Sequence, residues 1–460
     1  MKNKPYLLPL LAAAAVVIAI IAACALFFSR SRAIPLTVLD KDGNVLISAK
    51  APSELADDPR WAYLDLAVTE AAEILAEQTG SEAEEAKRNL LTGGFTIATC
   101  FDADVFAALE QAHAQWSTDA PCALAVTDLK GGLLAVYAHS PDARRVNYAA
   151  ARLSPYSALK PLSVYAPALE AGIIHWATMY EDSAYKQLPD SDGILRDWPA
   201  NASGTYSLAG ATVYEGIRKS LNTVAVKCLK DVGVKNALNF LTDAFGMPLE
   251  QELYLVKTVG EEEIIGNIAM GYLKTGVTPV EMAGYYQIFA TGGIYTAPTA
   301  IRAMEDKEGN ILYRSRPQET QVVSPATADT LNRMLQGVVS PSGTGTQANC
   351  TVPIAGKTGT GDDYTDNWFV GVTGAYSIAA WHGLCHDNQA DRLFALAADG
   401  IHAAKPHARK VFITHQTLYP VVYCAESGMA VSAGCGRIEM GYFTEKEPLP
   451  PCGIHENEKE

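Results

Sequence analysis

The hydrophobic and polar positions divide this chain into an apolar N-terminal segment, a strand-rich region, a helical middle and a strand-rich end. Residues 6–28 carry no charge, and a helix of this length crosses the hydrocarbon layer of a membrane, which is about 30 Å thick. A cleaved signal peptide would have a shorter apolar core of about 7 to 15 residues. We therefore predict a transmembrane anchor in residues 1–32.

The run Ile21-Ala22-Ala23-Cys24 offers an alternative, because it resembles a bacterial lipoprotein box in which Cys24 is lipidated. A polar linker normally follows such a cysteine, whereas here the apolar run continues to Phe28. The anchor is therefore the preferred interpretation. Both interpretations place the rest of the chain at the membrane.

Alternation and turn residues predict the elements that follow. A hairpin is expected around the polar turn 40–44, and residues 54–92 have a helical period with many glutamates, which is typical of a linker or pedestal. The same rules predict strand 95–99, helix 104–115, hairpin strands 123–127 and 133–137, a mostly helical stretch 159–281, and strands around 352–354, 367–372 and 376–381. Strand-rich regions on both sides of a helical middle predict an α/β (α+β) fold in which helices cover a sheet.

The composition narrows the range of possible partners and of covalent crosslinks. With 51 acidic and 36 basic side chains the net charge is -15, which disfavours a nucleic-acid partner. The chain has nine cysteines, which would permit disulfides outside the cytoplasm. Cys424, Cys435 and Cys452 are the best-placed candidates, because they lie in a tail too short to form its own core. Free structural thiols are the alternative.

Ser157 and Lys160 form the first candidate catalytic pair. Three residues apart on a helical turn, they fall on one face, so the amine reaches the hydroxyl. A serine nucleophile needs a base, and burial by the apolar residues 162–169 would lower the lysine pKa as that role requires. Ser183 and Lys186 have the same spacing, but they lie among acidic residues and are predicted to form a surface loop.

Ser220 and Asn222 form the second candidate motif, and a helical run follows them. The hydroxyl of Ser220 would relay a proton to the leaving amine. The amide of Asn222 would hold both Lys160 and the substrate peptide.

The third candidate consists of four residues that follow an apolar strand: Lys357, Thr358, Gly359 and Thr360. A peptide aligned as an added strand would present its terminal carboxylate to the threonine hydroxyls and the lysine charge. The backbone N–H groups of Thr360 and Ser157 would form the oxyanion hole. A similar run, 274–276, precedes Pro279 at a predicted helix start and has a structural explanation.

The three motifs follow one another in the order found in penicillin-binding proteins and class A β-lactamases. From about residue 94 to residue 455, the chain resembles the transpeptidase part of class A penicillin-binding proteins. The matching stretches include 93–96, 220–226, 277–283 and 355–371.

This resemblance implies roles for the candidate residues. Ser157 would be the acylated nucleophile, Lys160 its base, Ser220 and Asn222 the second motif, and residues 357–360 the substrate-binding strand. The implied fold is β-lactamase/transpeptidase-like: a mainly antiparallel sheet between helices, with the serine at a helix N-terminus beside the edge strand.

The resemblance also implies the surroundings in which the chain works. The expected partners are peptidoglycan stem peptides ending in D-Ala-D-Ala, β-lactams and membrane lipid, without a cofactor or metal. The N-terminus would be cytoplasmic and the catalytic domain extracytoplasmic, in a bacterial cell membrane.

We therefore expect four segments: a cytoplasmic stub with the anchor (1–32), a linker (33–92), a transpeptidase domain (93–423) and a cysteine-containing tail (424–460). Class A proteins carry a glycosyltransferase domain between anchor and transpeptidase, and residues 33–92 cannot hold one. No polymerising activity is expected, and cooperation with a separate glycosyltransferase is left open.

Three other functions use the same motifs. A D,D-carboxypeptidase transfers the acyl group to water, and a β-lactam-sensing or non-catalytic receptor keeps the fold without turnover. A class A β-lactamase needs a deacylating glutamate, which Glu263, four residues before Asn267, resembles. The sequence that follows Asn267 is more similar to penicillin-binding proteins.

His382 and His386 are four residues apart and give the only weak indication of a metal site. Gly383 lies between them, directly after a predicted strand. An ordinary loop is the preferred interpretation.

Overall fold

The computed structural model describes residues 33–141, 145–208, 210–383 and 388–455. The predicted anchor and Cys24 lie outside these residues. Among the helices in the described ranges, none is both long and apolar enough to cross a bilayer.

A five-stranded sheet forms the centre of the molecule, and every neighbouring pair in it is antiparallel. Its strands, in spatial order, are β14 (Ala355–Thr360), β15 (Asp366–Val372), β16 (Tyr376–Gly383), β4 (Cys122–Asp128) and β5 (Leu133–His139). Their near-continuous burial reflects cover on both faces. The predicted hairpin 123–137 and the predicted strands 367–372 and 376–381 are confirmed.

The prediction of a strand around 352–354 was wrong, since the strand lies further along the chain and β14 begins at Ala355. Pro353 has no backbone N–H and cannot contribute to a hydrogen-bonded ladder, so the strand starts after it. The β14 strand lies at the edge of the sheet and carries residues 357–360.

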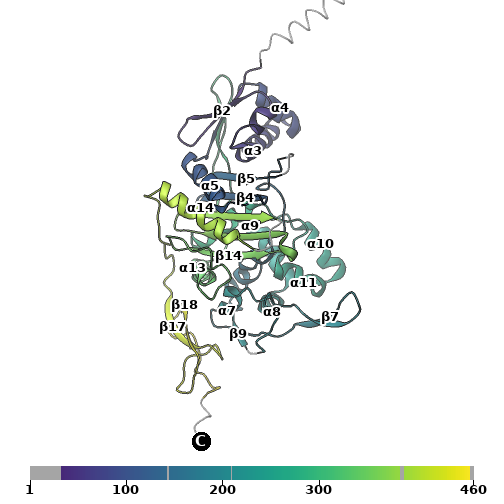
Figure 1. Cartoon of the computed structure of the whole chain (residues 1–460), viewed down its shortest axis with the longest axis vertical. Helices are drawn as coiled ribbons and strands as arrows, with labels where there is room; N and C mark the ends of the chain where they lie inside the picture. Colours follow the sequence, from purple (N-terminus) through teal and green to yellow (C-terminus); the bar gives the residue numbers. More distant parts are fainter. Residues whose placement is uncertain (1–32, 142–144, 209, 384–387, 456–460) are drawn as a thin grey trace, which may run out of the picture.

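Two helices, α5 (Ala103–Trp116) and α14 (Ala390–Ala404), pack against each other and over the strands (Figure 1). Helix α12 (Pro279–Tyr286) also packs on the sheet, where it contacts β4, β15 and β16. Its start is fixed by a capping box between Thr278 and Glu281, with Pro279 in the first turn. The predicted helices at 104–115 and from Pro279 are confirmed.

A second five-stranded sheet forms an N-terminal module together with α2 (Pro52–Ala56), α3 (Trp61–Thr79) and α4 (Ala83–Thr92). Its strands, in spatial order, are β12 (Ile311–Arg314), β11 (Ile301–Glu305), β3 (Thr96–Thr99), β1 (Leu36–Leu39) and β2 (Val45–Ala49). The predicted hairpin around 40–44 is confirmed as β1 and β2. The linker segment thus shares a sheet with residues 301–314.

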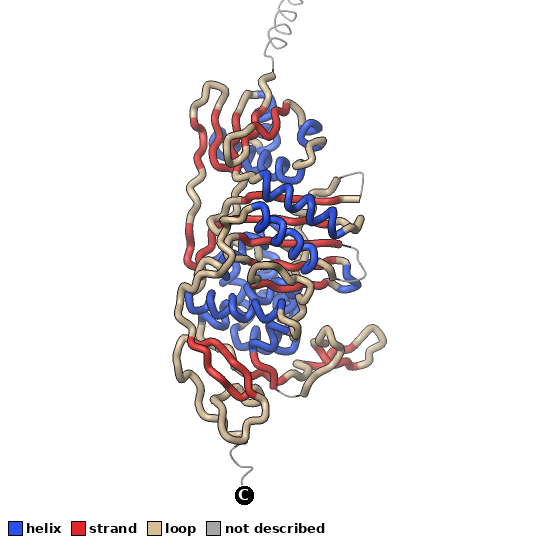
Figure 2. Tube along the Cα trace, turned by 60° about the vertical axis from the view of Figure 1, so that its left-hand side comes forward, coloured by secondary structure: helices blue, strands red, loops and turns tan. Residues whose placement is uncertain are grey.

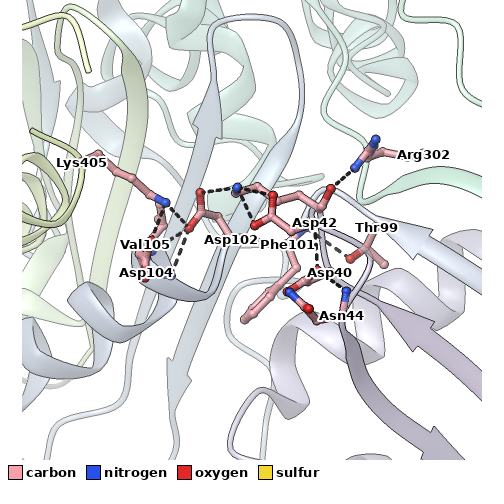
Figure 3. A network of polar contacts seen from close by, with 11 residues as sticks. Asp40, Asp42, Asn44, Thr99, Phe101, Asp102, Asp104, Val105, Arg302 and Lys405 are labelled. Carbon is pink, nitrogen blue, oxygen red and sulfur yellow. Dashed lines mark hydrogen bonds and ion pairs between the residues drawn. The ribbon is translucent and has the colours of Figure 1, made fainter. Parts of the chain in front are cut away.

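A polar network joins this module to the central layer (Figure 3). Asp102 caps α5 by accepting hydrogen bonds from the backbone N–H groups of Asp104 and Val105. Its carboxylate also lies 2.8 Å from the amine of Lys405, at the end of α14, and 3.8 Å from that of Lys41, in the β1–β2 turn. One buried carboxylate therefore connects the hairpin turn with both covering helices.

The middle segment contains the helices that surround the cleft. They are η1 (Tyr156–Leu159), η2 (Pro161–Tyr165), α6 (Ala166–Glu170), α7 (Val213–Arg218), α8 (Asn222–Val232), α9 (Val234–Phe245), α10 (Glu250–Val259) and α11 (Glu261–Met270). The expectation that 159–281 is mostly helical needs one correction, because residues 179–212 form four short strands. These are β6 (Met179–Glu181), β7 (Lys186–Pro189), β8 (Leu195–Trp198) and β9 (Gly210–Thr212). The Asp190–Gly193 turn, with a left-handed glycine, closes the β7–β8 hairpin.

The remaining elements lead to the C-terminal end of the molecule. They are η3 (Gln287–Phe289), β10 (Ile294–Thr296), β13 (Glu319–Gln321), α13 (Pro325–Gln336), η4 (Gly337–Val339), η5 (Asp362–Tyr364), β17 (Tyr419–Cys424) and β18 (Ile438–Phe443). Figure 2 shows the red strands of the central sheet in the middle, with the N-terminal module above and the β17–β18 hairpin at the opposite end.

Candidate active site

Ser157 lies on η1, a single 3₁₀ turn at the start of the helical run that continues through η2 and α6. A 3₁₀ helix has three residues per turn, so the side chains of Ser157 and Lys160 leave on the same side. Tyr156, just before the serine, has a left-handed backbone with φ 48°. Its carbonyl oxygen lies so close to Gly271 that a Cβ there would be 2.0 Å away. Such a strained position next to a reactive group is typical of functional sites.

The amine of Lys160 is fully buried and lies in a ring of oxygen acceptors. It donates to the amide oxygen of Asn222 at 2.6 Å, the carbonyl oxygen of Ser220 at 3.1 Å and the hydroxyl of Ser220 at 3.4 Å. Burial lowers the pKa of Lys160 to about 7. A large share of this amine is therefore neutral near pH 7 and able to accept a proton.

Ser220 and Asn222 lie between the end of α7 and the start of α8. Ser220 has a left-handed backbone with φ 57°, and its carbonyl and hydroxyl both lie within hydrogen-bond distance of Lys160. The Asn222 side chain donates to the carbonyl oxygen of Ala200 at 2.7 Å. This bond leaves the amide oxygen of Asn222 facing Lys160.

Lys357 reaches the same hydroxyl from the edge strand β14. Its buried amine donates to Ser220 Oγ at 2.9 Å and to the carbonyl oxygen of Thr358 at 3.0 Å. Burial, and then the nearby charge of Lys160, lowers the pKa of Lys357 well below its usual value. The hydroxyl of Thr358 lies 2.8 Å from that of Thr344.

Gly359 allows β14 to pack directly against η1. A Cβ at this position would be 2.4 Å from the carbonyl oxygen of Pro155 and 3.1 Å from the backbone nitrogen of Ala158. The missing side chain of Gly359 thus makes room for the turn that carries Ser157. The close approach places the strand beside the nucleophile turn.

These residues line one open cleft of about 520 Å³. Its lining includes seven polar residues from the predicted motifs and their neighbours: Ser157, Ser220, Asn222, Thr344, Thr358, Thr360 and Asn388. Lys160 and Lys357 lie behind this surface and reach Ser220 from beneath. The cleft therefore presents hydroxyl groups backed by two buried amines.

The structure brings the residues of all three motifs together and places the look-alike motifs elsewhere. Ser183 is half-buried between β6 and β7 and accepts a hydrogen bond from Lys227. Residues 274–276 pack on Glu252, which accepts from the backbone of Lys274. Glu263, the possible deacylating glutamate, is exposed on α11 and does not line the cleft.

Thr344, Asn388 and Tyr272 are among the residues lining the cleft that were not found from the sequence. Thr344 contacts Thr358, and Asn388 donates to the carbonyl oxygen of Gly359 at 3.0 Å and to the hydroxyl of Thr360 at 2.8 Å. Tyr272 packs edge-on to Tyr156. Each lies far from the motifs in sequence and has no local pattern that marks it.

The preferred interpretation of His382 as a loop residue was wrong. His382 belongs to β16 and is buried, and its Nε2 accepts a hydrogen bond from the backbone N–H of Gln389 at 3.0 Å. Residues 384–387, which include His386, lie outside the described ranges.

Comparison with known proteins identifies the family. The family model described as "Penicillin binding protein transpeptidase domain" matches residues 122–412. The chain therefore belongs to the family of penicillin-binding protein transpeptidase domains, and the resemblance predicted from its motifs is confirmed. Membership supports a transpeptidase function in general terms.

One curated relative is penicillin-binding protein 1A of Clostridium botulinum (strain Hall), which is 33% identical over 250 residues. The match covers 53% of this chain and 28% of that protein, so the chain spans less than a third of its relative's length. Similarity to penicillin-binding proteins 1A is consistent with the predicted resemblance to class A penicillin-binding proteins.

Solved structures share the fold. The D,D-transpeptidase domain of a peptidoglycan glycosyltransferase from Eggerthella lenta has a TM-score of 0.62 at 20% identity, with 81% of this chain and 99% of that chain covered. PonA1 from Mycobacterium tuberculosis, solved in complex with penicillin V, has a TM-score of 0.60 at 21% identity over 77% of this chain and 96% of that one. The predicted α/β transpeptidase fold is thus confirmed for the described residues.

Proposed function

We propose that the chain is a peptidoglycan D,D-transpeptidase that crosslinks stem peptides through an acyl-enzyme on Ser157 and binds penicillin covalently at the same residue. The observation that carries the proposal is the pair of buried amines, Lys160 and Lys357, that meet at Ser220 behind the cleft that Ser157 lines. Serine acyl transfer needs a nearby base with a lowered pKa, and the buried Lys160 suits that role.

In the first step, Ser157 Oγ attacks the carbonyl carbon between the two D-alanines. The hydroxyl proton passes to the neutral amine of Lys160, and the carbonyl becomes an oxyanion. The backbone N–H groups of Ser157 and Thr360 are the proposed donors to this oxyanion. Their proximity is favoured by the packing of η1 on β14 at Gly359.

In the second step, the peptide bond breaks and the terminal D-alanine leaves as an amine. Ser220 accepts hydrogen bonds from Lys160 and Lys357, so its hydroxyl can give its proton to the leaving nitrogen while it takes from Lys160 the proton that came from Ser157. The acyl group then stays on Ser157 until an acceptor amine takes it. A β-lactam would be attacked in the same way, but its cleaved ring amine stays tethered to the acyl group.

The edge strand suits a peptide substrate. No described strand pairs with the outer side of β14, so an extended peptide can align there. Thr358 and Thr360 line the cleft, and Lys357 lies behind Thr358. These groups would receive the terminal carboxylate of the substrate, with Asn222 holding the peptide backbone.

The cellular setting is part of the proposal. The uncharged run 6–28 supports a single membrane anchor with a cytoplasmic N-terminus, and stem peptides and β-lactams would be met by an extracytoplasmic domain at 93–423. Membrane lipid would then surround the uncharged run 6–28. A separate glycosyltransferase would supply the glycan strands that carry the stem peptides.

Intact-protein mass spectrometry after incubation with penicillin tests the nucleophile. The full chain in detergent should gain the mass of one penicillin on Ser157, and Ser157→Ala should gain none. Ser183→Ala is the matched control and should be acylated like the wild type. Acylation that survives Ser157→Ala, or that maps to Ser183, would refute the assignment.

Product analysis with a stem peptide and an amine acceptor tests the reaction. Crosslinked dimer together with released D-alanine supports the transpeptidase. Released D-alanine without dimer would identify a carboxypeptidase, and a stable penicillin adduct without any peptide turnover would identify a β-lactam-sensing receptor.

A further inference from the structure

The C-terminal tail gathers four potential metal ligands into one cluster. The sulfur atoms of Cys424, Cys435 and Cys452 and a ring nitrogen of His455 all lie within 4.8 Å of one another. His455 Nδ1 is 3.3 Å from Cys452 Sγ and 3.6 Å from Cys424 Sγ. Ligand atoms around a tetrahedral Zn²⁺ are separated by about 3.5 to 3.8 Å, given Zn–S and Zn–N bonds of about 2.3 and 2.0 Å.

Three separate chain segments bring the ligands together. Cys424 ends strand β17, and backbone hydrogen bonds between Ala430 and residues 450–452 draw Cys452 alongside. Gly434 places Cys435 next to His455, because its Cα lies so close to the His455 backbone that a Cβ would be 2.3 Å from the carbonyl oxygen. Backbone contacts of the tail, and not only contacts between the ligating side chains, therefore bring these residues together.

A carboxylate orients the histidine. Nε2 of His455 lies 2.8 Å from the carboxylate of Glu426, which leaves Nδ1 directed at the cysteines. Zinc-binding histidines commonly bond a carboxylate through the nitrogen that does not hold the metal. Glu426 thus has the position expected of such a partner.

A disulfide explains this cluster less well than a metal does. Cys424, Cys435 and Cys452 were the best-placed candidates for a disulfide, with free thiols as the alternative, and all seven cysteines in the described ranges are free thiols. One disulfide would join two of the three cysteines and would not explain why the third thiol and His455 lie in the same cluster. The tail buries few large apolar side chains, with Val422, Ile438, Met440 and Ile454 exposed, so a crosslink of some kind is needed.

We infer that Cys424, Cys435, Cys452 and His455 form a structural Zn²⁺ site that holds the C-terminal tail together. On binding, the three thiols lose their protons to solvent and the sulfur atoms bond the metal as thiolates, with Nδ1 of His455 as the fourth ligand. All four positions are taken by protein, so the metal has no open position for chemistry. This inference does not depend on the proposed transpeptidase function.

Metal analysis of the full chain tests the site. Protein isolated under anaerobic, reducing conditions and dialysed should retain about one Zn²⁺ per chain. Cys435→Ser should lose most of this zinc, whereas Cys350→Ser, which removes a half-buried thiol outside the cluster, should retain it. Glu426→Gln should weaken zinc affinity about 10-fold or more without removing a ligand.

Cobalt substitution gives a readout that needs no variant. Zinc-free wild-type protein titrated with Co²⁺ should develop the thiolate charge-transfer and visible absorption bands of a tetrahedral sulfur-rich site. Circular dichroism checks that each protein sample is folded. Failure of reduced, folded protein to bind Zn²⁺ and Co²⁺, equal zinc content in Cys435→Ser and wild type, or a disulfide among the three cysteines of anaerobically isolated protein would each overturn the inference.

Discussion

Lys160 and Lys357 meet at a single hydroxyl, with Ser220 Oγ 3.4 Å from the amine of the first and 2.9 Å from the amine of the second. Both amines are buried, and charge on one disfavours charge on the other. The two amines therefore resist being positively charged at the same time. A lysine held in this way is available as a base at a pH where an exposed lysine is fully charged.

The rate of acylation by penicillin should depend on the protonation of Lys160. Burial lowers the pKa of this amine to about 7, and only the neutral form accepts the Ser157 proton. The rate should therefore be low in acid, reach half its maximum near pH 7 and level off at higher pH. Stopped-flow measurement of acylation between pH 5 and 9 checks this, and a rate independent of pH would count against Lys160 as the base.

Asn222→Asp provides a second test of the same base. The amide oxygen that accepts from Lys160 at 2.6 Å would become part of a carboxylate. An adjacent negative charge favours the protonated amine, so the inflection of the acylation rate should move upward by about one pH unit or more. An unchanged inflection would show that another group controls the profile.

Ser220→Ala should slow acylation by about 10²- to 10⁴-fold, because it removes the hydroxyl that links the two amines to the leaving nitrogen. The protein should remain folded, since Lys160 keeps its bond to Asn222. Ser163→Ala is the control: this buried hydroxyl bonds only backbone carbonyl oxygens of Leu159 and Ile268. Equal rates for the two variants would mean that Ser220 acts only in packing.

Gly359→Ala should separate the edge strand from the nucleophile turn. The added methyl group would lie 2.4 Å from the carbonyl oxygen of Pro155, and overpacking of this kind costs about 1 to 3 kcal/mol. Displacement of Ser157 should also lower the acylation rate about 10²-fold. Urea unfolding and acylation kinetics should show both losses, while Gly436→Ala, which has no neighbour within 4 Å, should show neither.

Asp102→Ala should destabilise the contact between the N-terminal module and the central layer. The variant removes the cap of α5, an interaction whose loss costs about 1 to 2 kcal/mol, together with the ion pair to Lys405. Asp104 also pairs with Lys405 but is 65% exposed, so Asp104→Ala should cost less than about 1 kcal/mol. Urea unfolding compares the two, and a larger effect of Asp104→Ala would contradict the ranking.

The motifs were predictable because each is local. Ser157 and Lys160 are one helical turn apart, and residues 357–360 are consecutive, so spacing alone indicates which side chains face together. The central strands were predictable for a similar reason, since burial on both faces makes residues 123–127 and 376–381 apolar except for Thr127 and Ser377.

Long-range contacts explain what the sequence did not reveal. Thr344 and Asn388 join the cleft only through the packing of β14, and neither has a neighbour in sequence that suggests a site. The zinc ligands were noticed as cysteines, but His455 was not connected with them, because only the fold of the tail brings it to Cys424.

The shared sheet of the N-terminal module has a consequence for synthesis of the chain. Strand β3 lies between β1, from the start of the chain, and β11, which is made only after the helices of the cleft. Until residues 301–314 leave the ribosome, one edge of β3 has no partner and is open to pairing with another chain. The N-terminal module, most of which is made before β11, is therefore among the last parts to finish folding, contrary to the usual order in which earlier units fold first.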